Sequence, residues 1–170
     1  MLNLKSIISK IQNSKSVLYI LCGFPYSGKS YVSSQLQQQV GIKVVAIDDI
    51  FTAKGFDWDT NVLPSAIEWE QIFNESYEQV KDNLLQGKNV LYDSTNQTVV
   101  SRNKLRKAAE SVGAETCVLY IKTPTDTIWQ RWEENHKNHK RSVVGRELVQ
   151  QTIDMFEEPT EDEDVLVVEN

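Results

Sequence analysis

Long hydrophobic runs are absent from this sequence, and cysteine, proline and glycine are all scarce. No apolar stretch approaches the roughly 20 residues that cross a membrane. Lys5 and Lys10 interrupt the apolar positions of residues 1–15, whereas a secretory signal requires about 7–15 unbroken apolar residues. We therefore expect this segment to form a short amphipathic helix, and the protein to be soluble and cytoplasmic, without a membrane partner.

The two cysteines, Cys22 and Cys117, form no C-x-x-C pair, and each lies inside an apolar run. This pattern is typical of reduced, buried thiols in a cytosolic protein. Positive charge is also limited, because 18 Lys and Arg stand against 24 Asp and Glu, for a net charge of −6. That balance disfavours a broad nucleic-acid-binding surface, although it leaves room for a local basic patch.

No repeat, low-complexity tract or linker divides the chain, so residues 1–170 are expected to form a single domain. Five short apolar runs rich in β-branched residues predict strands; they are residues 16–22, 43–47, 89–92, 115–121 and 165–168. The runs are continuous rather than alternating, which is typical of a parallel sheet covered on both faces.

Helical patterns lie between these runs, at residues 29–39, 66–86, 99–111, 125–135 and 146–156. The second of them begins at a capping box, in which Ser65 precedes Glu68 by three residues, and ends at Gly87. Strands that alternate with helices predict an α/β doubly wound fold. Ligands of such folds bind beyond the carboxyl ends of the strands, so polar residues at those ends are the candidates for chemistry.

Residues 23–30 read Gly-Phe-Pro-Tyr-Ser-Gly-Lys-Ser, a full match to the phosphate-binding motif G-x-x-x-x-G-K-[ST]. The glycines allow backbone amides to turn inward around phosphates, Lys29 can reach the β- and γ-phosphates, and the Ser30 hydroxyl can ligate Mg²⁺. An apolar run precedes the motif and a helical pattern follows it, as a P-loop requires. The expected ATP-binding residues belong to this loop and the helix that follows it; they are Gly23, Tyr26, Ser27, Gly28, Lys29, Ser30 and Tyr31.

Carboxylates follow two other predicted strands. Asp48 and Asp49 come directly after the second apolar run, and Asp93 closes the third. A carboxylate beside the γ-phosphate can accept the proton of an attacking hydroxyl, which suggests Asp48 as a catalytic base; the alternative is a helix cap or a solvated loop. Asp93 lies where an acid organises Mg²⁺ in P-loop proteins, or else it forms an Asx turn.

A basic, polar stretch at residues 131–141 follows the fourth predicted strand and its helix. We expect a lid at about residues 132–145, in which Arg131 and Arg141 neutralise charge during phosphoryl transfer. A solvated helix end is the alternative interpretation. His136 and His139 are read as solvated lid residues rather than metal ligands. A small GTPase is disfavoured, because residues 103–106 read Asn-Lys-Leu-Arg instead of N-K-x-D.

The segments GFPYSGKS, AIDDI, YDSTNQTVVSRNKLRKAA and ELVQQTIDMFEEP together resemble the P-loop kinases grouped with polynucleotide 5′-hydroxyl kinases, to which chloramphenicol phosphotransferase and zeta-toxin-like kinases are related. The likeness spans about residues 16–160. It implies a three-layer P-loop NTPase fold, with a five-stranded parallel sheet in the order 2-3-1-4-5, helices on both faces and a small lid. It also implies that Asp48 is the general base and that Arg131 and Arg141 are lid arginines. The implied acceptor-binding residues are Asp49, Asp93, Thr95, Asn96 and Arg102.

Residues 50–53 depart from that resemblance, because the first basic residue after the Asp pair is Lys54. Polynucleotide kinases often carry an arginine there, so the departure weakens the case for a nucleic-acid acceptor. In the loop that follows, Phe56 or Trp58 could stack on a flat acceptor, and Asp57 and Asp59 would favour a cationic one. The loop could equally be a surface loop with one buried tryptophan.

The sequence thus predicts a phosphotransferase that uses ATP and Mg²⁺ to phosphorylate a hydroxyl group of an unidentified small molecule. One alternative is a 5′-hydroxyl polynucleotide kinase, for which the basic residues of the predicted helix at 99–111 offer some support. Another is a nucleotide-binding module without catalysis, against which the intact Lys29, Ser30, Asp48 and Asp93 argue. The acidic residues 157–164 are expected to form a solvated loop before the last strand.

Overall fold

A computed structural model describes residues 4–140 and 142–169 of the chain. Arg141, one of the two expected lid arginines, therefore lies outside the described residues. The elements follow the order α1 (Lys5–Gln12), β1 (Val17–Cys22), α2 (Lys29–Val40), β2 (Lys43–Ala46), α3 (Ile47–Ala53), α4 (Ala66–Leu85), β3 (Val90–Asp93), α5 (Val99–Glu110), β4 (Glu115–Lys122), α6 (Thr125–Asn138), α7 (Arg146–Asp154), the 3₁₀ helix η1 (Glu161–Glu163) and β5 (Val165–Glu169).

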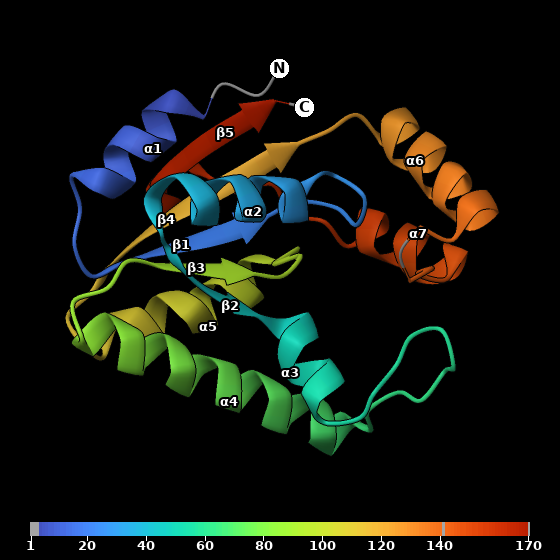
Figure 1. The fold of residues 1–170 in the computed structure, drawn as a ribbon, viewed down its shortest axis with the longest axis horizontal. Coiled ribbons are helices and arrows are strands. Elements are labelled where there is room, and N and C mark those ends of the chain that lie inside the picture. The colour runs from blue at the N-terminus through green and yellow to red at the C-terminus, as the bar shows by residue number, and fades with distance from the viewer. Residues whose placement is uncertain (1–3, 141, 170) are drawn as a thin grey trace.

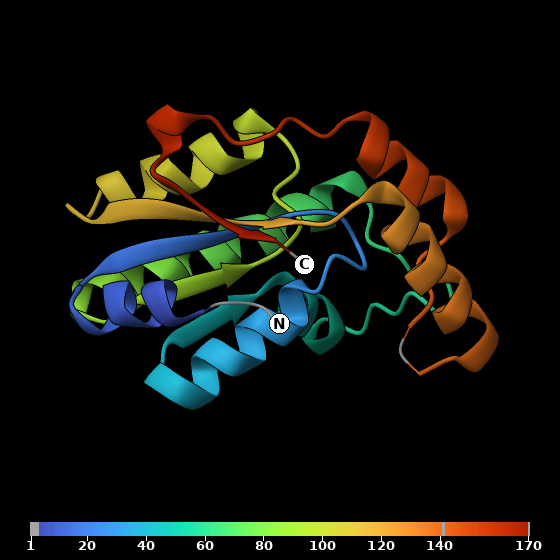
Figure 2. The same cartoon turned by 90° about the horizontal axis from the view of Figure 1, so that it is seen from above.

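The five strands form one sheet in the order β2-β3-β1-β4-β5, and every neighbouring pair is parallel. Helices α1 and α2 cover one face of this sheet, and α4 and α5 cover the other (Figures 1 and 2). The α/β fold and the strand order that the resemblance implied are thus confirmed.

Strand β1 explains why the strands read as continuous apolar runs. Its residues alternate between two separate cores: Leu18, Ile20 and Cys22 pack with α4 and α5, while Tyr19 and Leu21 pack with α1 and α2. All six residues of β1 are buried, since a helical layer lies on each side. The cysteines fit this pattern, because Cys22 and Cys117 are both free and buried, as the sequence indicated.

Most element boundaries lie within a few residues of those expected. The amphipathic N-terminal helix is α1, and the capping box at Ser65 and Glu68 begins α4 as predicted. One helix was missed, because the second strand ends at Ala46 and α3 begins at Ile47. Asp48 thus lies in the first turn of a helix, where a carboxylate is stabilised by the helix dipole.

The predicted lid at residues 132–145 is helical over its first half, because α6 continues to Asn138 before the chain turns back into α7. The acidic segment 157–164 also differs from expectation. Glu163 is only 2% exposed, so this segment is not simply a solvated loop. Among residues 4–140 and 142–169, no helix has both the length and the apolar character needed to cross a membrane.

Candidate nucleotide-binding site

The P-loop connects the end of β1 to the start of α2, at the carboxyl edge of the sheet. Gly23 has φ +152°, and a Cβ there would lie 2.9 Å from the Ile121 carbonyl oxygen and 2.9 Å from Ser27 Oγ. Gly28, with φ +102°, is the N-cap of α2. Both conformations favour glycine, and at Gly23 the space itself also excludes a side chain. The first glycine of the motif is therefore required by the packing of the loop against β4.

Hydrogen bonds fix the loop to neighbouring segments. The Gly23 amide donates to the Thr95 carbonyl at 3.1 Å, and Thr123 Oγ1 donates to the Ser27 carbonyl at 3.0 Å. Lys29 Nζ donates to the carbonyls of Gly23 at 3.0 Å and Phe24 at 2.7 Å. The ammonium group thus lies over the loop at the N-terminus of α2, where helix dipole and charge both favour an anion.

Two carboxylates, those of Asp48 and Asp93, interact with that ammonium because β2 and β3 end side by side, with Ala46 paired to Asp93. Burial raises the pKa of Asp93; a hydrogen bond from Ser33 and the charge of Lys29 oppose the increase, and Asp48 and Asp49 add to it. Burial also raises the pKa of Asp48, with Lys29 opposing and Asp49 reinforcing the shift, although the Asp48 side chain still reaches solvent. This cluster is half-desolvated, as acid–base groups in active sites commonly are.

These residues fit a magnesium ion that takes part of its coordination from phosphate and water. Within the described residues no three His, Cys, Asp or Glu side chains are arranged to hold a metal by themselves. Mg²⁺ prefers oxygen ligands and usually keeps several waters beside one or two carboxylates and substrate phosphates. Ser30, the first residue after Lys29, and Asp93 supply oxygens of that kind, so the expected metal ligands are chemically suited to the ion.

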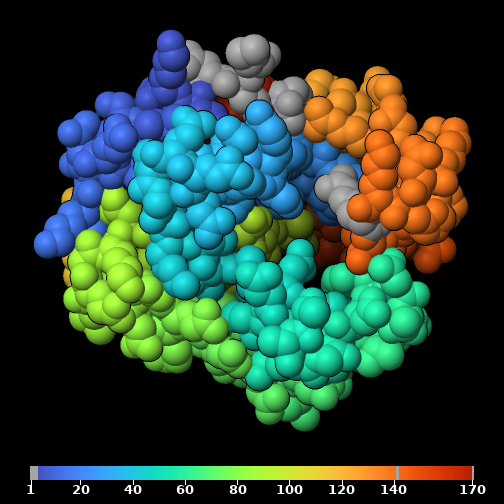
Figure 3. Space-filling model, in the orientation of Figure 1, coloured from blue at the N-terminus to red at the C-terminus, as the bar shows by residue number. Residues whose placement is uncertain are grey.

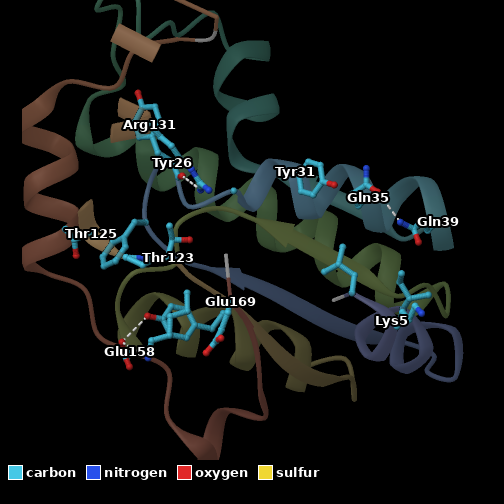
Figure 4. A pocket seen from close by; sticks show the side chains of 17 residues that line it. Lys5, Tyr26, Tyr31, Gln35, Gln39, Thr123, Thr125, Arg131, Glu158 and Glu169 are labelled. Carbon is cyan, nitrogen blue, oxygen red and sulfur yellow. Dashed lines mark hydrogen bonds and ion pairs between the residues drawn. The ribbon is translucent and has the colours of Figure 1, made fainter. Parts of the chain in front are cut away.

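A cavity of about 1500 Å³ begins at the P-loop and runs along α2 (Figure 4). Tyr31, Gln35 and Gln39 line it at helical spacing from α2, and Thr123 and Arg131 line it from the other side. The strand order puts this space on the β4 side of β1, whereas the carboxylates come from the β2 side. The loop thus lies between a large cavity and an acidic cluster.

The lid packs directly on the P-loop. Tyr26 forms a small apolar core with Ile128 of α6 and Val149 of α7, and its hydroxyl accepts a hydrogen bond from the Val144 amide at 3.3 Å. Arg131 Nη1 donates to the Tyr26 carbonyl at 3.1 Å. The expected lid arginine Arg131 is thus brought against the phosphate loop. The surface of the molecule is hollowed between α2, α3 and the lid helices (Figure 3).

The loop at residues 54–64 meets the lid from the other side. The Asp59 carboxylate accepts hydrogen bonds from Ser142 Oγ at 2.9 Å and from the Val143 amide at 3.1 Å. Trp58 stacks on Phe51 of α3 with ring centroids 5.0 Å apart. The loop therefore matches the surface-loop interpretation with a half-buried tryptophan, and Asp59 is engaged by the lid rather than directed at a cationic acceptor.

A family model described as "Chromatin associated protein KTI12" matches residues 17–164, which is most of the chain. The chain belongs to the KTI12 family. Kti12 of Chaetomium thermophilum, solved in complex with ADP-AlF3, has a TM-score of 0.69 at 19% identity, over 88% of this chain and 87% of that one. The P-loop-kinase-like fold expected from the motifs is thereby confirmed, while the narrower resemblance to polynucleotide 5′-hydroxyl kinases and their relatives stays a prediction.

Sugar kinases share the fold of this KTI12-family chain. A gluconokinase from Sinorhizobium meliloti has a TM-score of 0.61 at 15% identity, over 92% of this chain and 84% of that one. A sugar kinase from Janibacter sp. has a TM-score of 0.65 at 13% identity, over 90% and 84%. At such identities the likeness establishes architecture alone. A comparison with curated proteins gives no match.

The structure of this KTI12-family chain contradicts the acceptor-binding role that the resemblance implied for two residues. Arg102 is fully buried, and its guanidinium binds Glu163 with distances of 2.7 and 3.0 Å. Asn96 is also buried, and its Nδ2 donates to the Leu21 carbonyl at 2.6 Å. Both polar groups are directed into the protein behind the P-loop, so neither is available to an acceptor.

The remaining expected residues stay near the loop. Thr95 is half-buried, and its Oγ1 donates to the Gln97 side chain at 2.8 Å. Asp49 is exposed beside Asp48, and Tyr31 is 58% exposed on α2. Thr123, which bonds to the P-loop and lines the cavity, was not predicted from the sequence. It directly follows β4, and a polar residue at the end of a predicted strand is the signal that identified Asp93.

Proposed function

We propose that this KTI12-family chain binds magnesium–ATP and transfers the γ-phosphoryl group to a hydroxyl of a small molecule. The observation that carries the proposal is the meeting of a lysine ammonium, a phosphate loop and strand-end carboxylates at one edge of the sheet. The complex of Chaetomium thermophilum Kti12 with ADP-AlF3 supports nucleotide binding by this chain.

The nucleotide is proposed to lie along α2. Backbone amides of the P-loop and the N-terminus of α2 would bind its phosphates. The cavity beside Tyr31 and Thr123 is large enough for its base and ribose, since ligand sites typically measure about 300–1000 Å³. Ser30 and Asp93 would hold Mg²⁺, which supplies charge neutralisation between the β- and γ-phosphates.

The acceptor is proposed to approach from the β2 side, where Asp48 lies. Its hydroxyl proton passes to the Asp48 carboxylate while its oxygen forms a bond to the γ-phosphorus. The bond from that phosphorus to the β–γ bridging oxygen breaks, and ADP leaves. The raised pKa of Asp48 makes its carboxylate a stronger base than an ordinary aspartate. Arg131, already at the P-loop, and Arg141 are proposed to neutralise charge as the group moves.

Most of the arginine charge on α5 is buried or hydrogen-bonded within the protein, which favours a small-molecule acceptor over a nucleic-acid end. Arg102 is buried, and Arg106 donates to Asn103 Oδ1 and to the Asp162 carbonyl. Only Lys104 and Lys107 of that run remain exposed, in a chain whose net charge is −6. The family description favours a second candidate, a nucleotide-binding module that works by association with chromatin rather than by transfer.

Phosphorus NMR of the protein with magnesium–ATP and pooled hydroxyl compounds tests the proposal. We expect ADP together with a new phosphomonoester signal, and neither with Lys29→Ala. Asp48→Asn should reduce transfer by about 10²- to 10⁴-fold while leaving nucleotide affinity unchanged, because it removes only the base. Asp82→Asn, an exposed change on α4, is the matched control.

The possible outcomes separate the candidates. Full transfer by Asp48→Asn would show that the base is assigned wrongly. A phosphomonoester formed only with 5′-hydroxyl oligonucleotides would favour a polynucleotide kinase. Nucleotide binding without transfer to any acceptor would favour the association module.

A further inference from the structure

Arg102 is an unusual residue to find at the centre of this fold, because its side chain is 0% exposed. Nε and Nη2 donate to the two carboxylate oxygens of Glu163 at 2.7 and 3.0 Å. Nη1 donates to the carbonyls of Asn96 and Glu157, both at 3.0 Å. One guanidinium therefore joins three segments that are distant in the sequence: the loop after β3, the linker after α7, and η1.

The first of these segments, the loop after β3, is hydrogen-bonded to the start of the P-loop and to the end of β1. Asn96 has a left-handed backbone with φ +47°, its side chain holds the Leu21 carbonyl at the end of β1, and its carbonyl accepts from Cys22 Sγ at 3.4 Å. Thr95, the preceding residue, accepts the hydrogen bond of the Gly23 amide. Fixing the Asn96 carbonyl thus fixes the point at which the phosphate loop leaves the sheet.

The second segment connects the lid to the same place. The Glu157 amide donates to the Gln97 carbonyl at 2.8 Å, so the linker after α7 is bonded to the loop that backs the P-loop. Phe156, one residue earlier, packs on Phe24 of the P-loop with ring centroids 4.5 Å apart. Arg102 therefore lies between the loop and the base of the lid, and holds a backbone carbonyl of each.

Stability alone does not account for a charge pair in this position. Taking two charges out of water is costly, and apolar residues of similar size often replace such a pair without loss of stability. Apolar residues cannot, however, hold the Asn96 and Glu157 carbonyls in one fixed arrangement. Burial acts to lower the pKa of Arg102, but the hydrogen bond and charge of Glu163 and the neighbouring Cys22 together raise it, so the guanidinium stays charged and keeps all its donors.

We propose that Arg102, oriented by Glu163, is a positioning residue that holds the phosphate loop and the base of the lid in the arrangement that binds nucleotide. This inference rests on the proposed nucleotide site, and it assigns to Arg102 a role in nucleotide affinity without contact with any ligand. Loss of the arrangement would leave the motif intact but its amides misaligned. In active sites a displacement of about 1 Å can lower the reaction rate by roughly 100-fold, and we expect misplaced phosphate-binding amides to lower nucleotide affinity on a comparable scale.

The test compares stability with affinity in the same variants. Arg102→Met alone leaves Glu163 buried without its partner and should unfold at lower urea concentration. The double variant R102M/E163L should recover most of that stability, yet bind magnesium–ADP about 10- to 100-fold more weakly by calorimetry. Exchange of the amides of residues 23, 24 and 26–28 should be faster in the double variant than in the wild type. Arg106→Met is the matched control, because Arg106 also reaches η1 from α5 but has no bond to residues 94–97.

Arg102→Lys provides a second route if the double variant fails to fold, because it keeps the charge but loses the forked contacts. It should fold and bind magnesium–ADP more weakly than the wild type. Wild-type affinity in the folded double variant, or in Arg102→Lys, would overturn the positioning role while leaving the proposed function in place. Absence of magnesium–ADP binding by the wild type itself would instead overturn both.

Discussion

Replacing Gly23 by alanine should damage the phosphate loop more than its single methyl group suggests. The new Cβ would lie 2.9 Å from the Ile121 carbonyl oxygen, a backbone atom of β4 that cannot move without distorting the sheet. The residue also has φ +152°, a conformation that side chains rarely adopt. Such strain costs about 1–3 kcal/mol per residue, and part of it can be relieved only if the loop moves away from β4. We expect an unfolding free energy lowered by about 2 kcal/mol and at least tenfold weaker nucleotide binding, which is about 1.4 kcal/mol.

Urea unfolding and calorimetry with magnesium–ADP measure the two effects separately. Gly113→Ala is the matched control, because Gly113 has φ +72° but nothing within 4 Å of a Cβ, and it lies far along the chain from the loop. It should cost about 1 kcal/mol of stability and leave binding unchanged. The reasoning is refuted if Gly23→Ala behaves like Gly113→Ala in both measurements.

Three further predictions concern the rest of the site. Burial raises the pKa of Glu163, but the hydrogen bonds from Arg102 and the Thr160 amide, together with the charges of Arg102 and Arg106, outweigh burial, so this pKa lies below its ordinary value of about 4.3. The stability that this pair contributes is therefore complete at pH values above the pKa of the unfolded state, and it is lost as pH falls through the native pKa. The unfolding free energy should fall less steeply with decreasing pH in R102M/E163L than in the wild type. An equal slope in the two proteins would contradict the pairing. Asp59→Ala should speed exchange of the Val143 amide, which loses its acceptor; unchanged exchange would show that Asp59 does not hold the lid. Trp58→Ala should lower the unfolding free energy by about 2 kcal/mol, less than for a fully buried ring, without changing phosphoryl transfer. Reduced transfer with an unchanged unfolding free energy would instead indicate that Trp58 contacts the acceptor.

The parts of the fold that could be predicted are those encoded in short segments. The P-loop is a contiguous motif, and strand β1 is a continuous apolar run because helices cover both of its faces. Helix α3 was missed because its seven residues are too few to establish a helical period, and Ile47 extended the apolar run of the strand before it.

The extent of α6 was underestimated because its last turn is polar. Trp132 and His136, four residues apart, stack with ring centroids 5.0 Å apart and support the helix where composition alone suggested a loop. Stacking of this kind depends on which rings face each other, and a polar composition does not reveal it.

Arg102 and Glu163 could not be paired from the sequence, since they are 61 residues apart and both belong to residue types that are mostly exposed. The family resemblance accordingly implied that Arg102 lies at the acceptor, and composition placed Glu163 in a solvated segment. Only the tertiary fold brings the two together, and it does so directly behind the loop that the motif identified.

Calorimetric titration with magnesium–ATP is the most direct measurement of the central claim, that residues 23–30 form a working nucleotide site. We expect one nucleotide bound per chain, with the heat abolished in Lys29→Ala, whose folded content is checked by circular dichroism. Binding that persists unchanged in Lys29→Ala, or no heat with the wild type, would contradict the account.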